Sequence, residues 1–237
     1  MLSGPPTPDV RVPGPVLALA RGRSLQPLWH NEIGGLTYRV GDDLVVKWSP
    51  PGFDLEPEVA RLRWAGAHLR VPVVVDHGSD EEGSWFVSGT LPGENAVSDR
   101  WKADPPTAVR AVGEGLRALH ERLPVADCPF SWSVDARLAG QAGAAAMQDA
   151  PDVDRVVVCH GDACVPNTMI GADGRWSAHV DLGSLGLADR WADLAVAIWS
   201  TEWNYGPGWG DALLDAYGVA ADPERADYYR RLWDLTS

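Results

Sequence analysis

Cysteine is scarce in this chain, whose three cysteines are Cys128, Cys159 and Cys164. A low, odd count predicts free thiols in a reducing compartment and argues against a disulfide-stapled scaffold. No apolar run approaches the roughly 18 residues that a transmembrane helix needs, so we expect no membrane partner. The first residues lack a basic stretch followed by an apolar one. We therefore expect no secretory signal peptide, and a cytoplasmic protein.

Positive charge is also in short supply. The net charge is −13, from 20 lysines and arginines against 33 aspartates and glutamates. Because nucleic-acid binding needs a basic face, this balance argues against a nucleic-acid partner. A cationic ligand would suit it, although many cytosolic proteins are acidic for solubility alone. The twelve tryptophans are unusual. Some could line a ligand site, but most should pack the core.

The order of strand-like and helix-like segments predicts an α+β fold. Apolar residues make up 45% of the 237 residues, enough for one large domain or two small lobes. We expect a loose, Pro/Gly-rich lead-in over 1–27, a small strand-rich lobe over 28–90 and a mainly helical lobe over 91–237. The first lobe should contain a hairpin around Gly41 and one helix that starts near Pro57.

The chemistry is concentrated in "VVVCHGDACVPNTMI", residues 156–170. Two strand-like runs follow it, joined by the turn residues 171–174, which is a hairpin signal. The hairpin should return Asp181 to the side of Asn167, with Asp162 five residues upstream of Asn167. Amide and carboxylate oxygens are hard ligands that suit Mg²⁺, particularly when a nucleotide's phosphates complete the shell.

The spacing in this segment matches that of protein-kinase catalytic loops. Those loops read H-R-D-x-x-x-x-N, followed by D-F-G. Here His160-Gly161-Asp162 precedes Asn167 by the same interval, and Asp181-Leu182-Gly183 follows. Asp162 would accept or orient the proton of a substrate hydroxyl, while Asn167 and Asp181 would hold the metal. We expect His160 to position the loop. The alternative is an ordinary polar turn around a hairpin.

A zinc site built from Cys159, His160 and Cys164 is a second interpretation of the same stretch. It is disfavoured because the segment has no C-x₂-C pair and because adjacent Cys159 and His160 are awkward joint ligands. Free, partly buried thiols are the favoured interpretation.

A kinase also needs a lysine that binds phosphate. Lys47 ends the apolar run "LVVKW", much as the lysine of V-A-I-K does. Glu58 lies on the apolar stripe of the following helix, so it needs a partner, and Lys47 is the natural one. A snorkelling lysine and a helix-dipole glutamate are the separate alternatives. Gly34 and Gly35 could let backbone amides approach phosphates, or could simply form a hairpin turn.

Together these segments resemble the aminoglycoside phosphotransferases, close to the 3'-phosphotransferase (kanamycin kinase) branch. The resemblance rests on "NEIGGLTYRV", "EVARLRWA", "LPGENAVSDRWKADP", "LRALHERLPVADCPFSW", "VVVCHGDACVPNTMI", "VDLGSLGLADRWADLAVA" and "YYRRLWDL". It implies a protein-kinase-like bilobal fold with a small antiparallel-sheet lobe that binds the nucleotide. The second lobe would carry the catalytic loop and the substrate site.

The resemblance also implies a function. It implies ATP and Mg²⁺ as cofactors and an aminoglycoside hydroxyl as the acceptor, with resistance as the outcome. Lys47, Glu58, Asp162, Asn167 and Asp181 would take the roles given above. The backbone of the linker from Gly89 to Leu91 would hydrogen-bond the adenine. Asp189 and Asp193 would hold the loop and the adjoining helix.

Three departures concern the acceptor. Ser184 stands where many relatives have arginine, the tail ends "LWDLTS" in place of an acidic-aromatic end, and the 131–155 segment is short. Glu202 and Asp234 are candidate contacts for a cationic sugar, although each alone reads as a solvated helix acid. A streptomycin 3''-type enzyme, another small-molecule hydroxyl kinase and an inactive pseudokinase stay open. So does the choice between monomer and homodimer.

Overall fold

The computed structural model describes Gly4, residues 10–147 and residues 149–236. It divides into two compact units. Unit 1 comprises Met1–Ala67 with Val71–Leu91, and unit 2 comprises His68–Arg70 with Pro92–Ser237. None of the helices formed by these described residues is long and apolar enough to cross a membrane.

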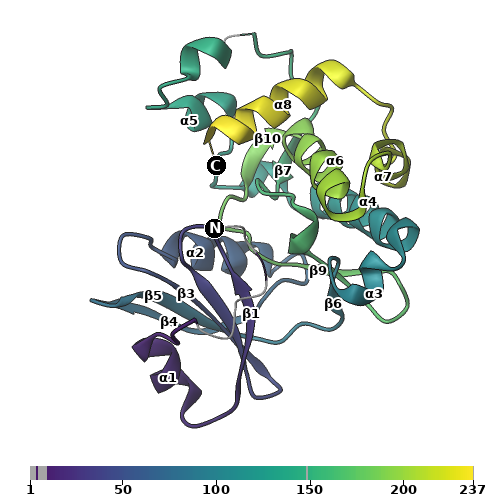
Figure 1. The fold of residues 1–237 in the computed structure, drawn as a ribbon. Helices are drawn as coiled ribbons and strands as arrows, with labels where there is room; N and C mark the ends of the chain where they lie inside the picture. Colours follow the sequence, from purple (N-terminus) through teal and green to yellow (C-terminus); the bar gives the residue numbers. More distant parts are fainter. Residues whose placement is uncertain (1–3, 5–9, 148, 237) are drawn as a thin grey trace. The chain divides into compact units, whose positions relative to one another are not determined.

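Unit 1 is built on a five-stranded antiparallel sheet with strand order β1-β2-β3-β5-β4 (Figure 1). Its strands are β1 Leu25–His30, β2 Leu36–Val40, β3 Leu44–Ser49, β4 Val74–Asp80 and β5 Gly83–Gly89. Its helices are α1 Gly14–Ala20 and α2 Glu56–Ala65. The predicted hairpin around Gly41 is confirmed, because β2 and β3 pair in register around it.

The core of unit 1 shows where the sequence prediction for residues 1–27 was incomplete. Residues 1–3 and 5–9 of that lead-in lie outside the described residues. The rest is not loose, since α1 buries Val16 and Ala20 in the same apolar cluster as Tyr38 of β2 and Val46 of β3. Pro15 does not prevent α1 from forming, because proline is tolerated in the first turn of a helix, where its missing N–H removes no helical hydrogen bond.

Helix α2 has the apolar stripe that the sequence predicts. Val59, Leu62 and Ala65 are each no more than 1% exposed, and Glu58 on the same helix is 5% exposed. A carboxylate buried among aliphatic side chains needs a cationic or hydrogen-bonding partner.

Unit 2 combines helices with two small sheets. The sheets have the orders β6-β8-β9 and β10-β7. The strands are β6 Glu94–Asn95, β7 Val156–Cys159, β8 Thr168–Ile170, β9 Trp176–His179 and β10 Gly186–Asp189. The α-helices are α3 Asp99–Lys102, α4 Pro105–Arg122, α5 Val134–Leu138, α6 Trp191–Tyr205, α7 Gly210–Tyr217 and α8 Pro223–Thr236. Short 3₁₀ turns are η1 Val125–Asp127, η2 Ala144–Met147 and η3 Val165–Asn167.

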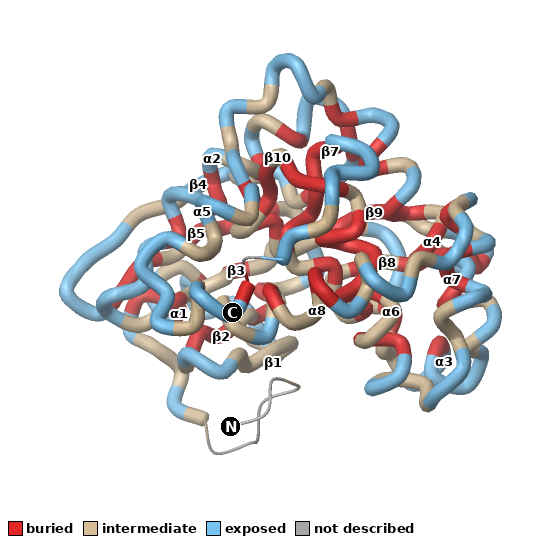
Figure 2. Tube along the Cα trace, turned by 90° about the horizontal axis from the view of Figure 1, so that it is seen from above, coloured by how far each residue is buried: buried red, intermediate tan, exposed pale blue. Residues whose placement is uncertain are grey.

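The core of unit 2 forms around α4 and the strands on either side of the kinase-like loop. One stripe of α4, formed by Val109, Val112, Leu116 and Leu119, is at most 1% exposed. Figure 2 shows β7 and β9 largely in the colour of buried residues. A loop that follows a buried strand begins from a rigid backbone. A catalytic loop needs such rigid support.

The short 131–155 segment folds onto the last helix. Its α5 lies beside α8 in Figure 1. The side chain of Arg137 donates to Thr236 Oγ1 at 3.0 Å, and Tyr228 Oη donates to the carbonyl of Met147 at 3.0 Å. The described part of this segment is therefore held by side chains of α8.

Candidate active site

The predicted hairpin brings the three oxygen-bearing residues of the kinase-like spacing into one region. Strands β8 and β9 pair so that Thr168 lies opposite His179. The next backbone bond continues the ladder, since Val180 N donates to Asn167 O at 3.0 Å. Asp181 follows directly and has a φ of 60°, a left-handed conformation that is uncommon for a non-glycine residue. The strands thus deliver Asp181 to the start of the hairpin.

Asp162 and Asn167 are in direct contact. Asn167 Nδ2 donates to the Asp162 carbonyl at 2.9 Å and to Asp162 Oδ2 at 3.2 Å. Asp162 Oδ1 is buried and has no hydrogen-bond partner among the described residues. Burial, and then the negative charge of Asp181, raise the pKa of Asp162 above its ordinary value. A buried acceptor beside a second carboxylate is suited to taking a proton or facing a cation.

His160 is fully buried, and both of its ring nitrogens are used. Its Nε2 donates to the Val180 carbonyl at 2.9 Å, and its Nδ1 accepts from Asp162 N at 3.4 Å. A neutral imidazole has one donor and one acceptor, and this pattern uses both. The expectation that His160 positions the loop is confirmed by these contacts.

Asp193 of α6 fixes the backbone of the same loop. Its Oδ2 accepts from His160 N at 2.6 Å and its Oδ1 accepts from Gly161 N at 2.9 Å. His120 Nε2 lies 2.9 Å from Oδ2, and His120 Nδ1 lies 2.8 Å from the Tyr217 hydroxyl. Burial, the largest single influence, would raise the pKa of Asp193, but the hydrogen bond from His120, the charges of His120 and His160 and the hydrogen bond from Gly161 N together outweigh it and lower the pKa. The structural role expected for Asp193 is confirmed.

Gly161 is required at its position by the space around it. Its φ is 82°, and a Cβ built there would lie 2.1 Å from the Ser184 carbonyl oxygen. The Gly161 carbonyl accepts from Trp132 Nε1 at 2.9 Å. The loop therefore passes closely between the segment after Asp181 and the Trp132 indole.

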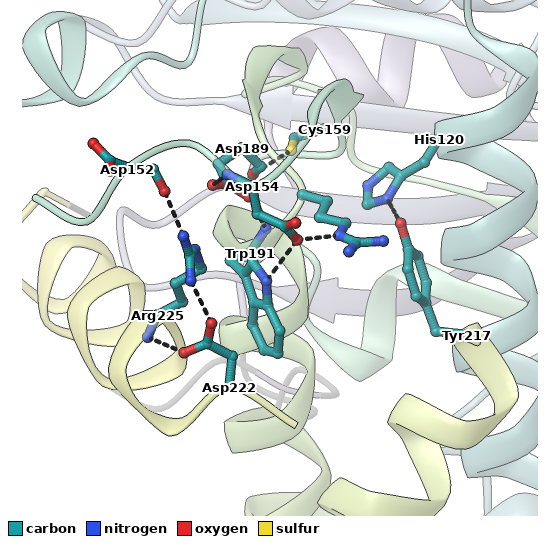
Figure 3. Close-up of polar contacts among 10 residues, drawn as sticks. His120, Asp152, Asp154, Cys159, Asp189, Trp191, Tyr217, Asp222 and Arg225 are labelled. Atoms are coloured by element: carbon teal, nitrogen blue, oxygen red, sulfur yellow. Dashed lines mark hydrogen bonds and ion pairs between the residues drawn. The ribbon is translucent and has the colours of Figure 1, made fainter. Parts of the chain in front are cut away.

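Asp189 is the last residue of β10 and anchors that end of the strand (Figure 3). Its carboxylate accepts from Trp191 N at 3.0 Å and from Asp154 N at 2.7 Å. Asp154 in turn accepts from Arg190 Nε at 2.6 Å and from Trp191 Nε1 at 3.1 Å. This network fixes the start of α6, the helix that carries Asp193. The structural role expected for Asp189 is confirmed.

In unit 1 the predicted pair of Lys47 and Glu58 is present. Lys47 Nζ of β3 lies 2.7 Å from Glu58 Oε2 of α2, and the two side chains are 15% and 6% exposed. An ion pair this well shielded from water is fixed in geometry, unlike a surface pair. Their part in binding a nucleotide stays a prediction.

The two glycines and the linker use some of their amides internally. Gly35 N donates to Asn31 Oδ1 at 2.6 Å, and Gly34 N donates to Asn31 O at 3.1 Å with a φ of 86° at Gly34. In the linker, Gly89 N donates to Val73 O at 3.1 Å. These amides serve the turn and the sheet. That ATP is contacted by Gly34, Gly35, Gly89 and Leu91 stays a prediction. Such contacts would use other backbone atoms of the same segments.

The zinc interpretation finds no support among the described residues. Cys159 Sγ donates to the Asp189 carbonyl at 3.3 Å, and burial raises its pKa well above the ordinary value. The potential ligands that do lie within 4.8 Å of one another are those of His120, Cys159 and Asp193. His120 and Asp193 are already bound to each other, so these groups are satisfied without an ion.

Glu202 and Asp234 lie on α6 and α8. Both are exposed, and Asp234 Oδ2 pairs with Arg230 Nη1 at 2.9 Å. The pairing with Arg230 weakens the case for Asp234, and the exposure of both agrees with solvated helix acids.

The residues that brace the loop were missed by sequence reasoning. Trp132 hydrogen-bonds Gly161 of the loop, 29 positions away in the chain. His120 hydrogen-bonds Asp193, 73 positions away. Ser200 Oγ, which accepts from Val165 N at 3.0 Å, is another. Only His120, a histidine on an otherwise apolar helix face, could have been singled out from the sequence.

The architecture and the loop together define a class of protein. A family model described as "Phosphotransferase enzyme family" matches residues 26–154 and 134–229. Among solved structures, an aminoglycoside-3'-phosphotransferase of type VIII is 27% identical with a TM-score of 0.75, over 94% of this chain and 97% of that one. APH(3'')-Id from Streptomyces rimosus is 25% identical with a TM-score of 0.72, over 93% and 96%. The predicted kinase-like α+β fold is confirmed.

Curated relatives narrow the class. An aminoglycoside 3'-phosphotransferase of Streptomyces fradiae is 35% identical over 76% of this chain and 79% of its own length. A streptomycin 3''-kinase of Streptomyces griseus is 32% identical over 86% and 89%. The chain belongs to the aminoglycoside phosphotransferases within the phosphotransferase enzyme family, as the sequence resemblance predicts.

Proposed function

We propose that this protein transfers the γ-phosphoryl group of ATP to a hydroxyl group of an aminoglycoside. The observation that carries the proposal is the contact between Asp162 and Asn167, with Asp181 returned to them by the β8–β9 hairpin. This arrangement has the spacing that phosphoryl-transfer enzymes use to orient a hydroxyl and to hold a metal.

Asp162 is the proposed general base. Its unpartnered Oδ1 is available to the acceptor hydroxyl, while Asn167 fixes the other oxygen. The contribution expected from such a base is about 10²- to 10⁴-fold in rate. His160 and Asp193 act through the backbone of the loop and hold Asp162 in place.

Asn167 and Asp181 are the proposed ligands of Mg²⁺. Amide and carboxylate oxygens are the donors that this ion prefers, so the residues present fit it. The ion would supply positive charge against the phosphates. The second carboxylate that raises the pKa of Asp162 is that of Asp181, and a cation at this position would relieve the repulsion between them.

ATP is the proposed phosphoryl donor. Lys47, held by Glu58, would bind its phosphates. The turn at Gly34 and Gly35 would cover them, and the backbone between Gly89 and Leu91 would bind the adenine. A solved structure of APH(3'')-Id contains ADP and streptomycin, and that chain is 25% identical to this one.

The proposed acceptor is the 3'-hydroxyl of a kanamycin- or neomycin-type antibiotic, and the proposed outcome is resistance. Several curated relatives are named aminoglycoside 3'-phosphotransferase. Glu202 and Asp234 would contribute carboxylates to a cationic sugar, the latter only if Arg230 releases it. The second candidate is the 3''-hydroxyl of streptomycin, because the streptomycin 3''-kinase is as similar, at 32%, as the 3'-phosphotransferase of Streptomyces ribosidificus.

We further propose a cytoplasmic enzyme that acts as a monomer or a homodimer. Sedimentation of the purified protein distinguishes the two, and a species of four or more chains would contradict both.

The function is tested by phosphate transfer from labelled ATP to a panel of aminoglycosides that includes kanamycin, neomycin and streptomycin. Asp162→Asn should lower kcat by at least about 100-fold. Asp173→Asn is the matched control, since Asp173 is an exposed acid of the nearby hairpin turn that accepts from Arg175 N. NMR of the product identifies the hydroxyl that is modified.

A folded wild-type protein that transfers phosphate to none of these acceptors would refute the proposal. ATP-dependent thermal stabilisation without turnover would instead support the pseudokinase alternative. Transfer to streptomycin alone would favour the second acceptor.

A further inference from the structure

The backbone on both sides of Asn167 is held by two consecutive residues, Asn95 and Ala96. Asn95 Nδ2 donates to the carbonyl of Pro166 at 2.5 Å. Ala96 N donates to the carbonyl of Thr168 at 2.9 Å. Strand β6, which contains Asn95, pairs antiparallel with β8, which starts at Thr168. The proposed metal ligand therefore lies between two hydrogen bonds from one short segment.

The bond from Asn95 satisfies a carbonyl that the local turn leaves without a partner. Pro166 belongs to the 3₁₀ turn Val165–Asn167, and carbonyls at the end of such a turn have no acceptor role within it. Proline has no N–H, so the carbonyl is the polar group by which Pro166 can be held. That carbonyl belongs to the planar peptide group that it shares with Asn167 N. Asn167 N donates to the Cys164 carbonyl at 2.9 Å, so both ends of this peptide group are bonded.

The orientation of the Asn95 amide is fixed by its two partners. Its Oδ1 accepts from Val97 N at 2.8 Å, in a local turn that asparagine favours. A reversed amide would put a donor against Val97 N–H and an acceptor against the Pro166 carbonyl, so one orientation alone satisfies both. Ala96 is fully buried, and its carbonyl accepts from Tyr205 Oη of α6 at 2.6 Å. The donor is thus presented by a segment that is itself anchored to α6.

This arrangement bears on the metal through the side chain of Asn167. Its Nδ2 is committed to Asp162, with bonds of 2.9 Å to the carbonyl and 3.2 Å to Oδ2. The other amide atom, Oδ1, is the atom proposed to bind Mg²⁺, an ion that demands near-ideal octahedral geometry. A side chain turns with the backbone that carries it, so a rotation of the peptide group between Pro166 and Asn167 would misplace Oδ1.

We propose that Asn95 is a positioning residue for Asn167 and that the affinity of the enzyme for Mg²⁺ depends on it. The inference rests on the proposed function, which assigns Asn167 to the metal. Loss of a hydrogen-bond partner behind a metal ligand typically costs about 10- to 100-fold in metal affinity. We expect the lower end of this range, because Asn95 acts on the peptide group before the ligand and not on the ligand side chain.

The test compares Asn95→Ser with a matched control. Asn95 is partly exposed, so serine is compatible with the fold. Serine keeps an acceptor for Val97 N but is too short to reach the Pro166 carbonyl. The control is Ser177→Ala, which removes a bond of 2.9 Å from Ser177 Oγ to the carbonyl of Pro92. That bond holds the same segment through a different residue.

Two measurements are made on each protein. Mn²⁺ prefers the same oxygen ligands as Mg²⁺, and electron paramagnetic resonance counts the free ion. Titration of the protein saturated with ADP gives the Kd of Mn²⁺ in the absence of turnover. Phosphate transfer at varied Mg²⁺ gives kcat and the Mg²⁺ concentration at half-maximal rate.

Asn95→Ser should raise the Kd of Mn²⁺ and the half-saturating Mg²⁺ concentration by about 10-fold. At saturating Mg²⁺, kcat should fall by less than this, because excess ion refills a weakened site. Ser177→Ala should behave as wild type. In the Asn167→Ala background, Asn95→Ser should add nothing to the Kd of Mn²⁺, because both changes act on one ligand.

The inference is overturned if Asn95→Ser binds Mn²⁺ as tightly as wild type. It is equally overturned if the effect persists in full in the Asn167→Ala background. A loss of the same size in Ser177→Ala would also overturn it, because a general loosening of the segment would then account for the result. A wild type that binds no Mn²⁺ with ADP defeats the metal site of the proposed function instead, so the two failures are distinguishable.

Discussion

Replacing Asp193 by asparagine keeps the size of the side chain but removes an acceptor that the loop needs. The carboxylate accepts from three N–H groups, those of His160, Gly161 and His120. In the least damaging orientation the new NH₂ group faces Gly161 N, which leaves a buried donor unsatisfied at a cost of about 1–3 kcal/mol. The other two bonds lose the carboxylate charge, at about 1 kcal/mol each. We expect Asp193→Asn to lower the free energy of unfolding by about 3–5 kcal/mol.

Two measurements check this value. Urea unfolding gives the change in free energy, with Asp227→Asn as the control, since Asp227 is an exposed acid of α8 paired with Arg231 and should contribute at most about 1 kcal/mol. Hydrogen exchange of the peptide that contains His160 and Gly161 reports on the loop itself. Exchange there should accelerate in Asp193→Asn and stay unchanged in the control.

The effect should also depend on pH with a definite sign. The pKa of Asp193 is lowered in the folded protein, so its stabilisation is fully present above the unfolded value of about 3.9. It is lost as the pH falls through the folded value. The difference between wild type and Asp193→Asn should therefore be constant near neutral pH and shrink in acid. The reasoning is refuted if Asp193→Asn loses no more stability than Asp227→Asn at pH 7.

Three further outcomes are expected. Lys47→Met and Glu58→Gln should each raise the KM for ATP, and the double variant should add little to the larger single effect, because the two side chains are in contact at 2.7 Å. Additive effects on KM would contradict a shared role. Gly161→Ala should lower the thermal unfolding temperature more than Gly140→Ala does. Both glycines have positive φ, but only at Gly161 would the new Cβ collide, 2.1 Å from a carbonyl oxygen. Equal losses in the two variants would show that the clash is relieved. Chelation with EDTA should abolish phosphate transfer, and Mg²⁺ but not Zn²⁺ should restore it. Restoration by Zn²⁺ alone would instead support the zinc site that includes the cysteine thiols.

The residues that the sequence placed correctly are close together along the chain. Asn167 and Asp181 are joined by one hairpin, so pairing in register is enough to bring them together. Lys47 and Glu58 belong to consecutive elements, and the position of Glu58 on an apolar stripe signals a buried acid that needs a cation. In both cases secondary-structure periodicity plus one turn fixes which side chains meet.

The predictions that failed or were never made concern packing. The proline-rich residues before β1 hide α1, which exists because Val16 and Ala20 bury against the sheet of unit 1 and not because of local propensity. The contact between the rings of Trp199 and Trp233 depends on α6 lying beside α8, two helices whose order in the chain does not fix which faces meet.

The sequence by itself therefore determined the reaction class, through a spacing of aspartates and asparagine that local hydrogen bonds convert into geometry. Only the tertiary structure decided how that geometry is held. The bonds from Trp132 to Gly161, from His120 to Asp193 and from Arg137 to Thr236 join residues 29 to 99 positions apart. Such contacts exist only after the core of unit 2 has packed, and residue type alone does not distinguish a bracing tryptophan from one that fills the core.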